Sequence, residues 1–140
     1  MVMKILCATD GLPHSDDAVA YAIDFAKKLG GHLTFIAINV PLLTRGVKSF
    51  LLEDAEIERI LVTAQNKARQ SGLADVGAAM AAGRDVAATI VHYAEQNGID
   101  HIVVGTGGPG FVSRLLLGSV SSAVIARAHC PVTVARPPHK

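Results

Sequence analysis

The sequence contains no tryptophan, and aromatic residues make up only 4% of its 140 residues. Proteins that bind single-stranded nucleic acid use aromatic side chains as stacking platforms, so this scarcity argues against that class. Charged residues amount to 18% and the net charge is +1, which gives no strong attraction to nucleic acid or to an anionic membrane. No apolar run approaches the roughly 18 residues of a membrane-spanning helix. We therefore expect neither nucleic acid nor a membrane as a partner.

Cysteine is also scarce, since only Cys7 and Cys130 occur. Both fall in or beside expected strands, which favours free thiols over a disulfide. The six histidines are scattered, and no Cys or His recurs at the spacing of metal ligands. The first residues enter a strand pattern directly, without the layout of a signal peptide. We expect no resident metal site and a cytoplasmic location.

Three familiar catalytic or nucleotide-binding motifs are missing or misplaced. No Gly-Lys-Ser or Gly-Lys-Thr triplet occurs, which excludes a P-loop, and Gly-x-Ser-x-Gly is absent. Gly105-x-Gly107-x-x-Gly110 has the letters of a dinucleotide fingerprint. That fingerprint normally follows the first strand, with an acidic residue about 20 positions later, and here it lies late in the chain.

Strand and helix patterns alternate along a chain that is half apolar and long enough for one domain, residues 1–140. This alternation predicts an α/β fold, an open five-stranded parallel sheet with helices on both faces. The expected strands are Lys4–Thr9, His32–Val40, Asp75–Ala82, Ile102–Val104 and Val132–Ala135. The expected helices are Ser15 or Asp16 to Leu29, Glu53–Ser71, Asp85–Gln96 and Gly118–Ala128.

Two details of this pattern carry specific expectations. Ser15 or Asp16 is expected to cap the first helix. Its apolar stripe is expected to comprise Ala18, Tyr21, Ala22, Phe25, Ala26 and Leu29.

The segment from Leu42 to Leu52 has no clear period but contains several apolar residues. It is interpreted as a loop, serving as a lid, as a partner contact or as a segment packed on its own domain.

A glycine-rich stretch joins the fourth strand to the last helix. Four glycines fall between Gly105 and Gly110, and Gly118 and Ser119 begin the helix, which Ser119 or a neighbour is expected to cap. Backbone N–H groups beside a helix N-terminus form a good anion site, and phosphate is the anion we expect. A simple tight turn is the alternative.

The spacing Gly105-x2-Gly108-x9-Gly118-Ser119 resembles the nucleotide-binding signature of the ATP-binding branch of the universal stress protein family. The run from Ser113 to Ser121, His129-Cys130-Pro131-Val132 and Ala8-Thr9-Asp10-Gly11 resemble the family as well, so the similarity covers essentially the whole chain. The resemblance implies a Rossmann-like sheet with its five strands in the order 3-2-1-4-5. The chain would then reverse direction between strands 1 and 4, where open sheets bind ligands.

The resemblance also implies ATP, with magnesium, as the ligand. Gly105 and Gly108 would let the loop wrap the ribose and phosphates. The phosphates would accept hydrogen bonds from the N–H groups of Gly118, Ser119 and Val120 and from the Ser119 hydroxyl. Asp10 would lie near the ribose or a magnesium-bound phosphate, and Val40 against the adenine. A turn that bonds its own backbone is the alternative role for Asp10. The full expected set is Thr9, Asp10, Val40, Gly105, Thr106, Gly108, Arg114, Gly118, Ser119 and Val120.

The loop departs from the family pattern at Gly107 and Pro109, where relatives often carry basic or larger polar residues. Fewer positive charges would weaken phosphate attraction, and proline removes one N–H donor. Arg114 remains as a phosphate partner, although a solvent-facing or dimer-contact role fits it equally. These departures put the affinity for nucleotide in question more than the class of ligand.

Three functions remain open. The first is a nucleotide-binding regulatory protein of the stress response, with ATP as a conformational or oligomeric switch. The second is a weak ATP hydrolase, for which Asp10 is the only candidate base. The third is a dimeric interaction module that no longer binds nucleotide. In each case we expect a homodimer, because the short apolar strand Val132–Ala135 lies at a sheet edge.

Overall fold

The computed structural model describes residues 2–106 and 118–136. Gly108 and Arg114 of the expected site, with their neighbours Gly107 and Pro109, lie outside the described residues. The described strands are β1 Lys4–Ala8, β2 His32–Asn39, β3 Pro41–Thr44, β4 Val47–Phe50, β5 Val76–Ala82, β6 His101–Gly105 and β7 Val132–Ala135. The described helices are α1 Pro13–Leu29, α2 Asp54–Gln70, α3 Val86–Gln96 and α4 Ser119–Arg127.

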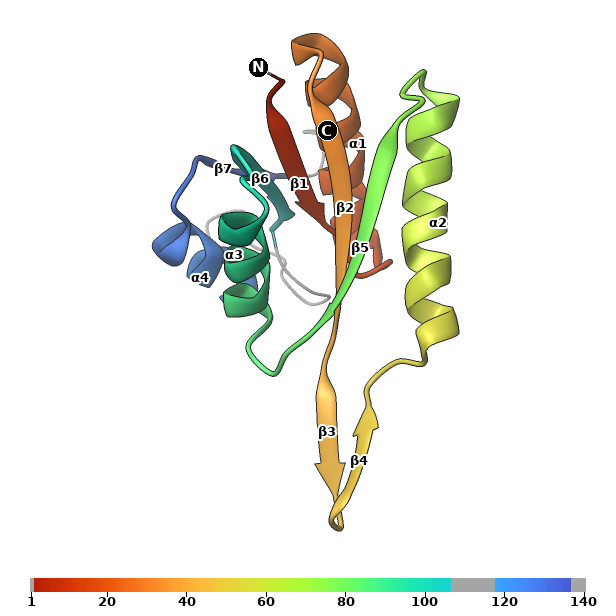
Figure 1. Ribbon diagram of the computed structural model, residues 1–140, viewed down its shortest axis with the longest axis vertical. Coiled ribbons are helices and arrows are strands. Elements are labelled where there is room, and N and C mark those ends of the chain that lie inside the picture. The colour runs from red at the N-terminus through yellow and green to blue at the C-terminus, as the bar shows by residue number, and fades with distance from the viewer. Residues whose placement is uncertain (1, 107–117, 137–140) are drawn as a thin grey trace.

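The main sheet has five strands in the order β5-β2-β1-β6-β7, and every pair in it is parallel (Figure 1). Counted without the separate hairpin, this is the order 3-2-1-4-5, so the expected α/β fold and topology are confirmed. Successive strands run outward from β1 in one direction and then from β6 in the other. The carboxyl ends of β1 and β6 therefore form the switch point of the sheet.

Helices cover both faces of the sheet because β1 is apolar on both sides. Ile5 and Cys7 pack with α1 and α2 in one buried cluster, and Leu6 packs with α3 and α4 in the other. The expected buried stripe of α3, namely Ala87, Ile90, Val91 and Ala94, is confirmed. Two-sided burial of this kind is typical of parallel sheets, and it holds the switch point in a rigid frame.

Helix α1 begins earlier than expected and is rotated relative to the expected stripe. Leu12 is its N-cap residue and makes no side-chain cap, and Pro13 begins the first turn with a φ angle that suits a helix start. Tyr21 and Leu29 are 42% and 49% exposed, whereas Val19 and Ile23 are buried. The expected cap was wrong because the Ser15 hydroxyl bonds Thr9 and the Leu12 carbonyl. Part of the stripe was wrong because the face of α1 that carries Val19 and Ile23 joins the buried cluster.

The segment expected to be a loop forms a β-hairpin of β3 and β4. Arg45 and Gly46 have φ angles of 53° and 78°, as a two-residue hairpin turn requires at both central positions. Arginine is not a usual residue for this conformation, which explains why the turn was missed. The interpretation as an irregular loop was therefore wrong.

Both cysteines are free, as expected. Cys7 is fully buried, and Cys130 is half-buried. Burial raises the pKa of the Cys7 thiol far above its usual range and also raises that of Cys130. Among the described helices, none combines the length and apolar character that crossing a membrane would demand.

Asp85 links the two helices on one face of the sheet. Its carboxylate caps α3 by accepting a hydrogen bond from the Ala88 N–H at 3.0 Å, as expected from the sequence. Its second oxygen accepts from Arg127 at the end of α4, at 2.8 Å. The Arg127 hydrogen bond, followed by the Ala88 N–H, holds the pKa of Asp85 below its usual value.

A lowered pKa in the folded state makes this link dependent on pH. The stabilisation is present above the unfolded pKa of about 4 and is lost as the pH falls through the folded pKa. Asp85→Asn keeps a capping oxygen but removes the charge. We expect its urea midpoint to lie below that of the native chain at pH 6 and the difference to shrink toward pH 2.

Arg127→Gln provides the matched control. It should reproduce the same pH dependence, and the double variant should lose little more than either single variant. Additive losses in the double variant would contradict the link.

Candidate functional site

The loop after β1 is held at the switch point by buried hydroxyl groups. The Thr9 N–H donates to the Ile36 carbonyl at 3.0 Å, which continues the pairing of β1 with β2 by one residue. The Thr9 Oγ1 lies 3.1 Å from the Ser15 Oγ, and both residues are buried. Ser15 therefore joins the first turn of α1 to the end of β1. The expectation that Ser15 caps the helix was wrong.

Asp10 follows at the surface, and its side chain is 48% exposed. Its Oδ1 accepts a hydrogen bond from the Leu12 N–H at 2.9 Å, and its Oδ2 lies 2.7 Å from the His14 Nε2. The alternative role as a turn residue is therefore observed. A carboxylate has about four lone-pair sites, so these two bonds leave capacity for a ligand. The Nδ1 of His14 is buried, without a partner among the described residues.

Gly105 lies where the end of β6 meets the start of α1. A Cβ atom at this position would lie 2.6 Å from the His14 carbonyl oxygen and 3.4 Å from the His14 Nδ1. No real side chain tolerates the first of these distances. Glycine is therefore required by the packing of the protein itself, in addition to any role that it has toward a ligand.

The start of α4 is anchored to the same strand end. The Ser121 hydroxyl donates to the Gly105 carbonyl at 2.5 Å, and the Gly118 N–H donates to the Thr106 carbonyl at 2.7 Å. The second bond corrects the expected role of Gly118, because its N–H is already used inside the protein. The N-cap residue of α4 is Gly118, a neighbour of Ser119, and no side chain caps the helix, so the expectation of a cap by Ser119 itself was wrong.

Of the three residues expected to offer N–H groups to a phosphate, Ser119 and Val120 remain. Both residues are exposed, and their N–H groups have no hydrogen-bond partner within residues 2–106 and 118–136. These groups lie in the first turn of α4, where the helix dipole favours negative charge. The first turn of α4 is therefore the part of the described edge best suited to an anion.

Val40 lies at the end of β2, on the far side of β1 from β6. It is half-buried, and its carbonyl accepts a hydrogen bond from the Leu51 N–H at 2.9 Å. Those expected residues that the structure describes thus come from three neighbouring strand ends and one helix start, all at the carboxyl edge of the sheet. Within the described parts of the chain, no group of three or more His, Cys, Asp or Glu is placed to hold a metal ion.

Sequence reasoning missed His14 and Ser121 as members of this edge. The spacing of Asp10 and His14, four residues apart at the start of a helix, was a usable signal for their contact. Ser121 carried no such signal, because only the packing of α4 shows that its hydroxyl is buried.

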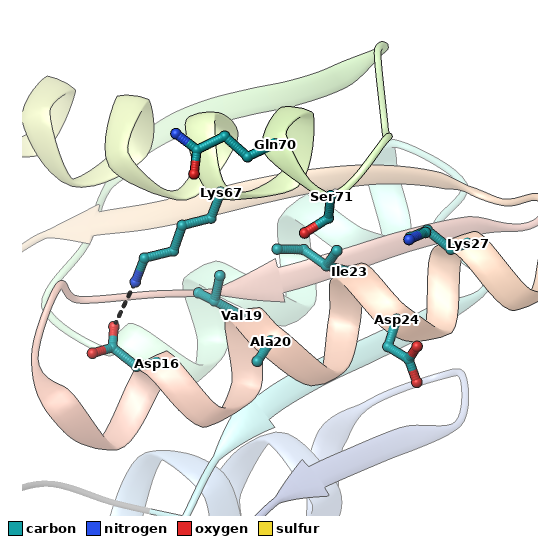
Figure 2. A pocket seen from close by; sticks show the side chains of 9 residues that line it. All are labelled: Asp16, Val19, Ala20, Ile23, Asp24, Lys27, Lys67, Gln70 and Ser71. Carbon is teal, nitrogen blue, oxygen red and sulfur yellow. Dashed lines mark ion pairs between the residues drawn. The ribbon is translucent and has the colours of Figure 1, made fainter.

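A separate groove lies between α1 and α2, on the face of the sheet away from α4 (Figure 2). It has a volume of about 410 Å³, and the Lys67 side chain reaches across it toward Asp16, with 3.5 Å between Nζ and Oδ1. A smaller hollow of about 200 Å³ shares Asp16 and Lys67 and extends to Thr9 and Gly11. The groove contains no residue of the site expected from the sequence, whereas the smaller hollow reaches that site at Thr9.

Comparison with known proteins agrees with this geometry. The sequence model of the universal stress protein family matches residues 1–136. The chain belongs to the universal stress protein family. The resemblance that the glycine spacing indicated is thereby confirmed as membership of the family.

Individual members show the same relationship. A universal stress protein of Methanocaldococcus jannaschii is 34% identical over 98% of this chain and 84% of its own. A universal stress protein of Thermus aquaticus is 35% identical over 97% of this chain and 100% of its own. A universal stress protein solved in complex with cAMP is 26% identical over 95% of each chain, with a TM-score of 0.73.

The anchor between α4 and β6 gives the first test of the site. Ser121→Ala removes the hydroxyl that bonds the Gly105 carbonyl, and we expect a loss of about 1 kcal/mol in the free energy of unfolding, measured in urea. Ser122→Ala is the control, because Ser122 is exposed on the same helix. Equal effects of the two substitutions would show that the anchor contributes nothing specific.

Proposed function

We propose that this protein binds an adenine nucleotide, ATP with magnesium, and that the nucleotide acts as a conformational or oligomeric switch in a cytoplasmic stress response. Residues 1–140 form one nucleotide-binding domain in this proposal. The nucleotide lies along the carboxyl edge of the sheet, with its phosphates at the start of α4. Gly108 and Arg114 belong to the proposed site by family resemblance.

The observation that carries the proposal is the convergence of β1, β6 and α4 at one point. Ser121 and Gly118 bond the carbonyls of Gly105 and Thr106, so the α4 start lies directly beside the strand end. This leaves the N–H groups of Ser119 and Val120 at the surface of the switch point. Helix starts at switch points are well suited to phosphate groups.

The solved relative that contains cAMP supports the class of ligand. Cyclic AMP and ATP share adenine, ribose and phosphate, so one crevice can recognise the common part. Val40 is at the strand end expected to face the adenine. Asp10 is half-exposed and can accept a hydrogen bond from a ribose hydroxyl.

Asp10 and His14 supply a route from binding to a conformational change. Asp10 bonds the Leu12 N–H and His14, which fixes the first turn of α1. A ribose hydroxyl or a magnesium ion at Asp10 competes with those contacts. The loop after β1 and the start of α1 would then differ between the free and bound states, which is the requirement for a switch.

Calorimetric titration of nucleotide-free protein with ATP and magnesium tests the proposal. We expect saturable heat, and we expect Asp10→Asn to weaken binding about tenfold, because it removes a charged hydrogen-bond acceptor. Glu95→Gln, on the exposed side of α3, is the matched control and should bind as the native chain does. No heat up to millimolar ATP from folded protein would overturn the proposal.

We also propose a homodimer formed through the edge strand β7, whose outer edge pairs with no other strand of the described residues. In this proposal the backbone groups on that edge pair with a second β7 across a two-fold axis. Light scattering at high micromolar concentration should give at least twice the mass of the chain. A monomer under those conditions would contradict the homodimer.

A further inference from the structure

The β3–β4 hairpin projects from the rest of the protein (Figure 1). It forms a two-stranded sheet of its own and does not join the five-stranded sheet. A two-stranded hairpin alone in water is marginally stable, because it has neither further strands nor a helix to pack against. The hairpin therefore needs either support from the domain or a covering surface.

Its surface is strongly apolar for an exposed element. Val47, Leu51 and Leu43 are 65%, 61% and 58% exposed, and Phe50 is 53% exposed. Exposed apolar residues are normal singly, but here they follow one another along a single projecting segment. Among the described residues, no further strand pairs with either edge of the hairpin, so backbone groups on both edges lack a strand partner there.

The domain fixes the base of the hairpin. Asn39 is 3% exposed, and its side chain donates to the Leu52 carbonyl at 2.7 Å and accepts from the Leu52 N–H at 3.1 Å. The Leu51 N–H donates to the Val40 carbonyl at 2.9 Å. These three bonds tie the two ends of the hairpin together, so the apolar strands are held ready for a contact.

Charge is distributed unequally along the hairpin. Arg45 is exposed at the tip, and Glu53, Asp54 and Glu56 are exposed at the base, where α2 begins. The acidic base also suits the positive end of the α2 dipole. A second hairpin running in the opposite direction would bring each basic tip beside an acidic base. The hairpin is thus complementary to a copy of itself.

We propose that β4 pairs with β4 of a second copy, antiparallel and across a two-fold axis at Ser49. The Leu51 N–H faces β3, so by alternation the backbone groups of Lys48 and Phe50 face outward and can pair. This register sets Val47 of one copy opposite Leu51 of the other, and Arg45 opposite Glu53. The interface is distinct from the one proposed for β7.

The two-fold axis makes the register testable by a disulfide. Ser49 pairs with itself as a non-hydrogen-bonded pair, with about 4.5 Å between Cα atoms, which is within disulfide range. In a Cys130→Ser background, Ser49→Cys should form a covalent dimer on mild oxidation. Arg45→Cys is the matched control, because two tips lie on the order of 27 Å apart in this arrangement and should not crosslink.

Charge reversal provides a second readout in the full chain. Arg45→Glu and Glu53→Arg should each reduce the Ser49→Cys crosslink several-fold, and the double reversal should restore it. By light scattering, Arg45→Glu alone should leave the β7 dimer and remove any larger assembly. The mass measured by light scattering thereby separates the β4 interface from the β7 interface. Neither the crosslinking result nor the light-scattering result depends on whether the protein binds nucleotide.

Three outcomes would overturn the proposal. These are no crosslink at Ser49, equal crosslinking at Ser49 and Arg45, or no restoration by the double reversal. Sedimentation with phosphatidylserine vesicles addresses the alternative occupant. Binding to them that Val47→Ser abolishes, in the absence of a Ser49 crosslink, would assign the surface to a membrane.

Discussion

The close approach of α1 to the end of β6 is the constraint on which the rest of the switch point depends. The backbone of His14 lies so near Gly105 that a single added methyl group would be 2.6 Å from its carbonyl oxygen. The same Gly105 carbonyl accepts the Ser121 hydroxyl, which brings the start of α4 to the same place. One residue without a side chain thus allows two helices from opposite faces of the sheet to meet at one strand end. A family signature glycine has a structural reason here, as well as the ligand-binding reason that the motif suggests.

Much of this edge is bonded within the protein itself. Asp10 bonds its own turn and His14, and the Gly118 N–H bonds Thr106. Such preformed bonds hold a loop in place at little cost in entropy when a ligand arrives. They also mean that a ligand at Asp10 must share or replace protein contacts. Binding and the arrangement of the α1 start are therefore coupled in the proposed function.

The sequence predicted the architecture well, because the strands are buried on both faces and separated by regular helices. Asp85 as the α3 cap and the buried stripe of α3 followed from local chemistry alone. The strand order required the family resemblance, since short apolar strands carry no label of their neighbours. The start of α1 was misplaced because Pro13 begins the first turn and the Ser15 hydroxyl is used in a contact with Thr9. The β3–β4 hairpin was missed because Arg45 adopts a positive φ without the usual turn residues. The contacts of Gly105 with His14 and Ser121 join residues far apart in the chain. Such contacts leave no repeating pattern in the sequence, so they could not be predicted from it.

The most direct measurement of the central claim is a titration of isotope-labelled protein with ATP and magnesium, followed by the backbone amide resonances in two-dimensional NMR. If the phosphates lie at the switch point, the amides of Ser119, Val120 and Asp10 shift most. Those of Lys27, Gln70 and Ser71, in the groove between α1 and α2, stay in place. Shifts confined to that groove, or no shifts at saturating nucleotide, would contradict the account.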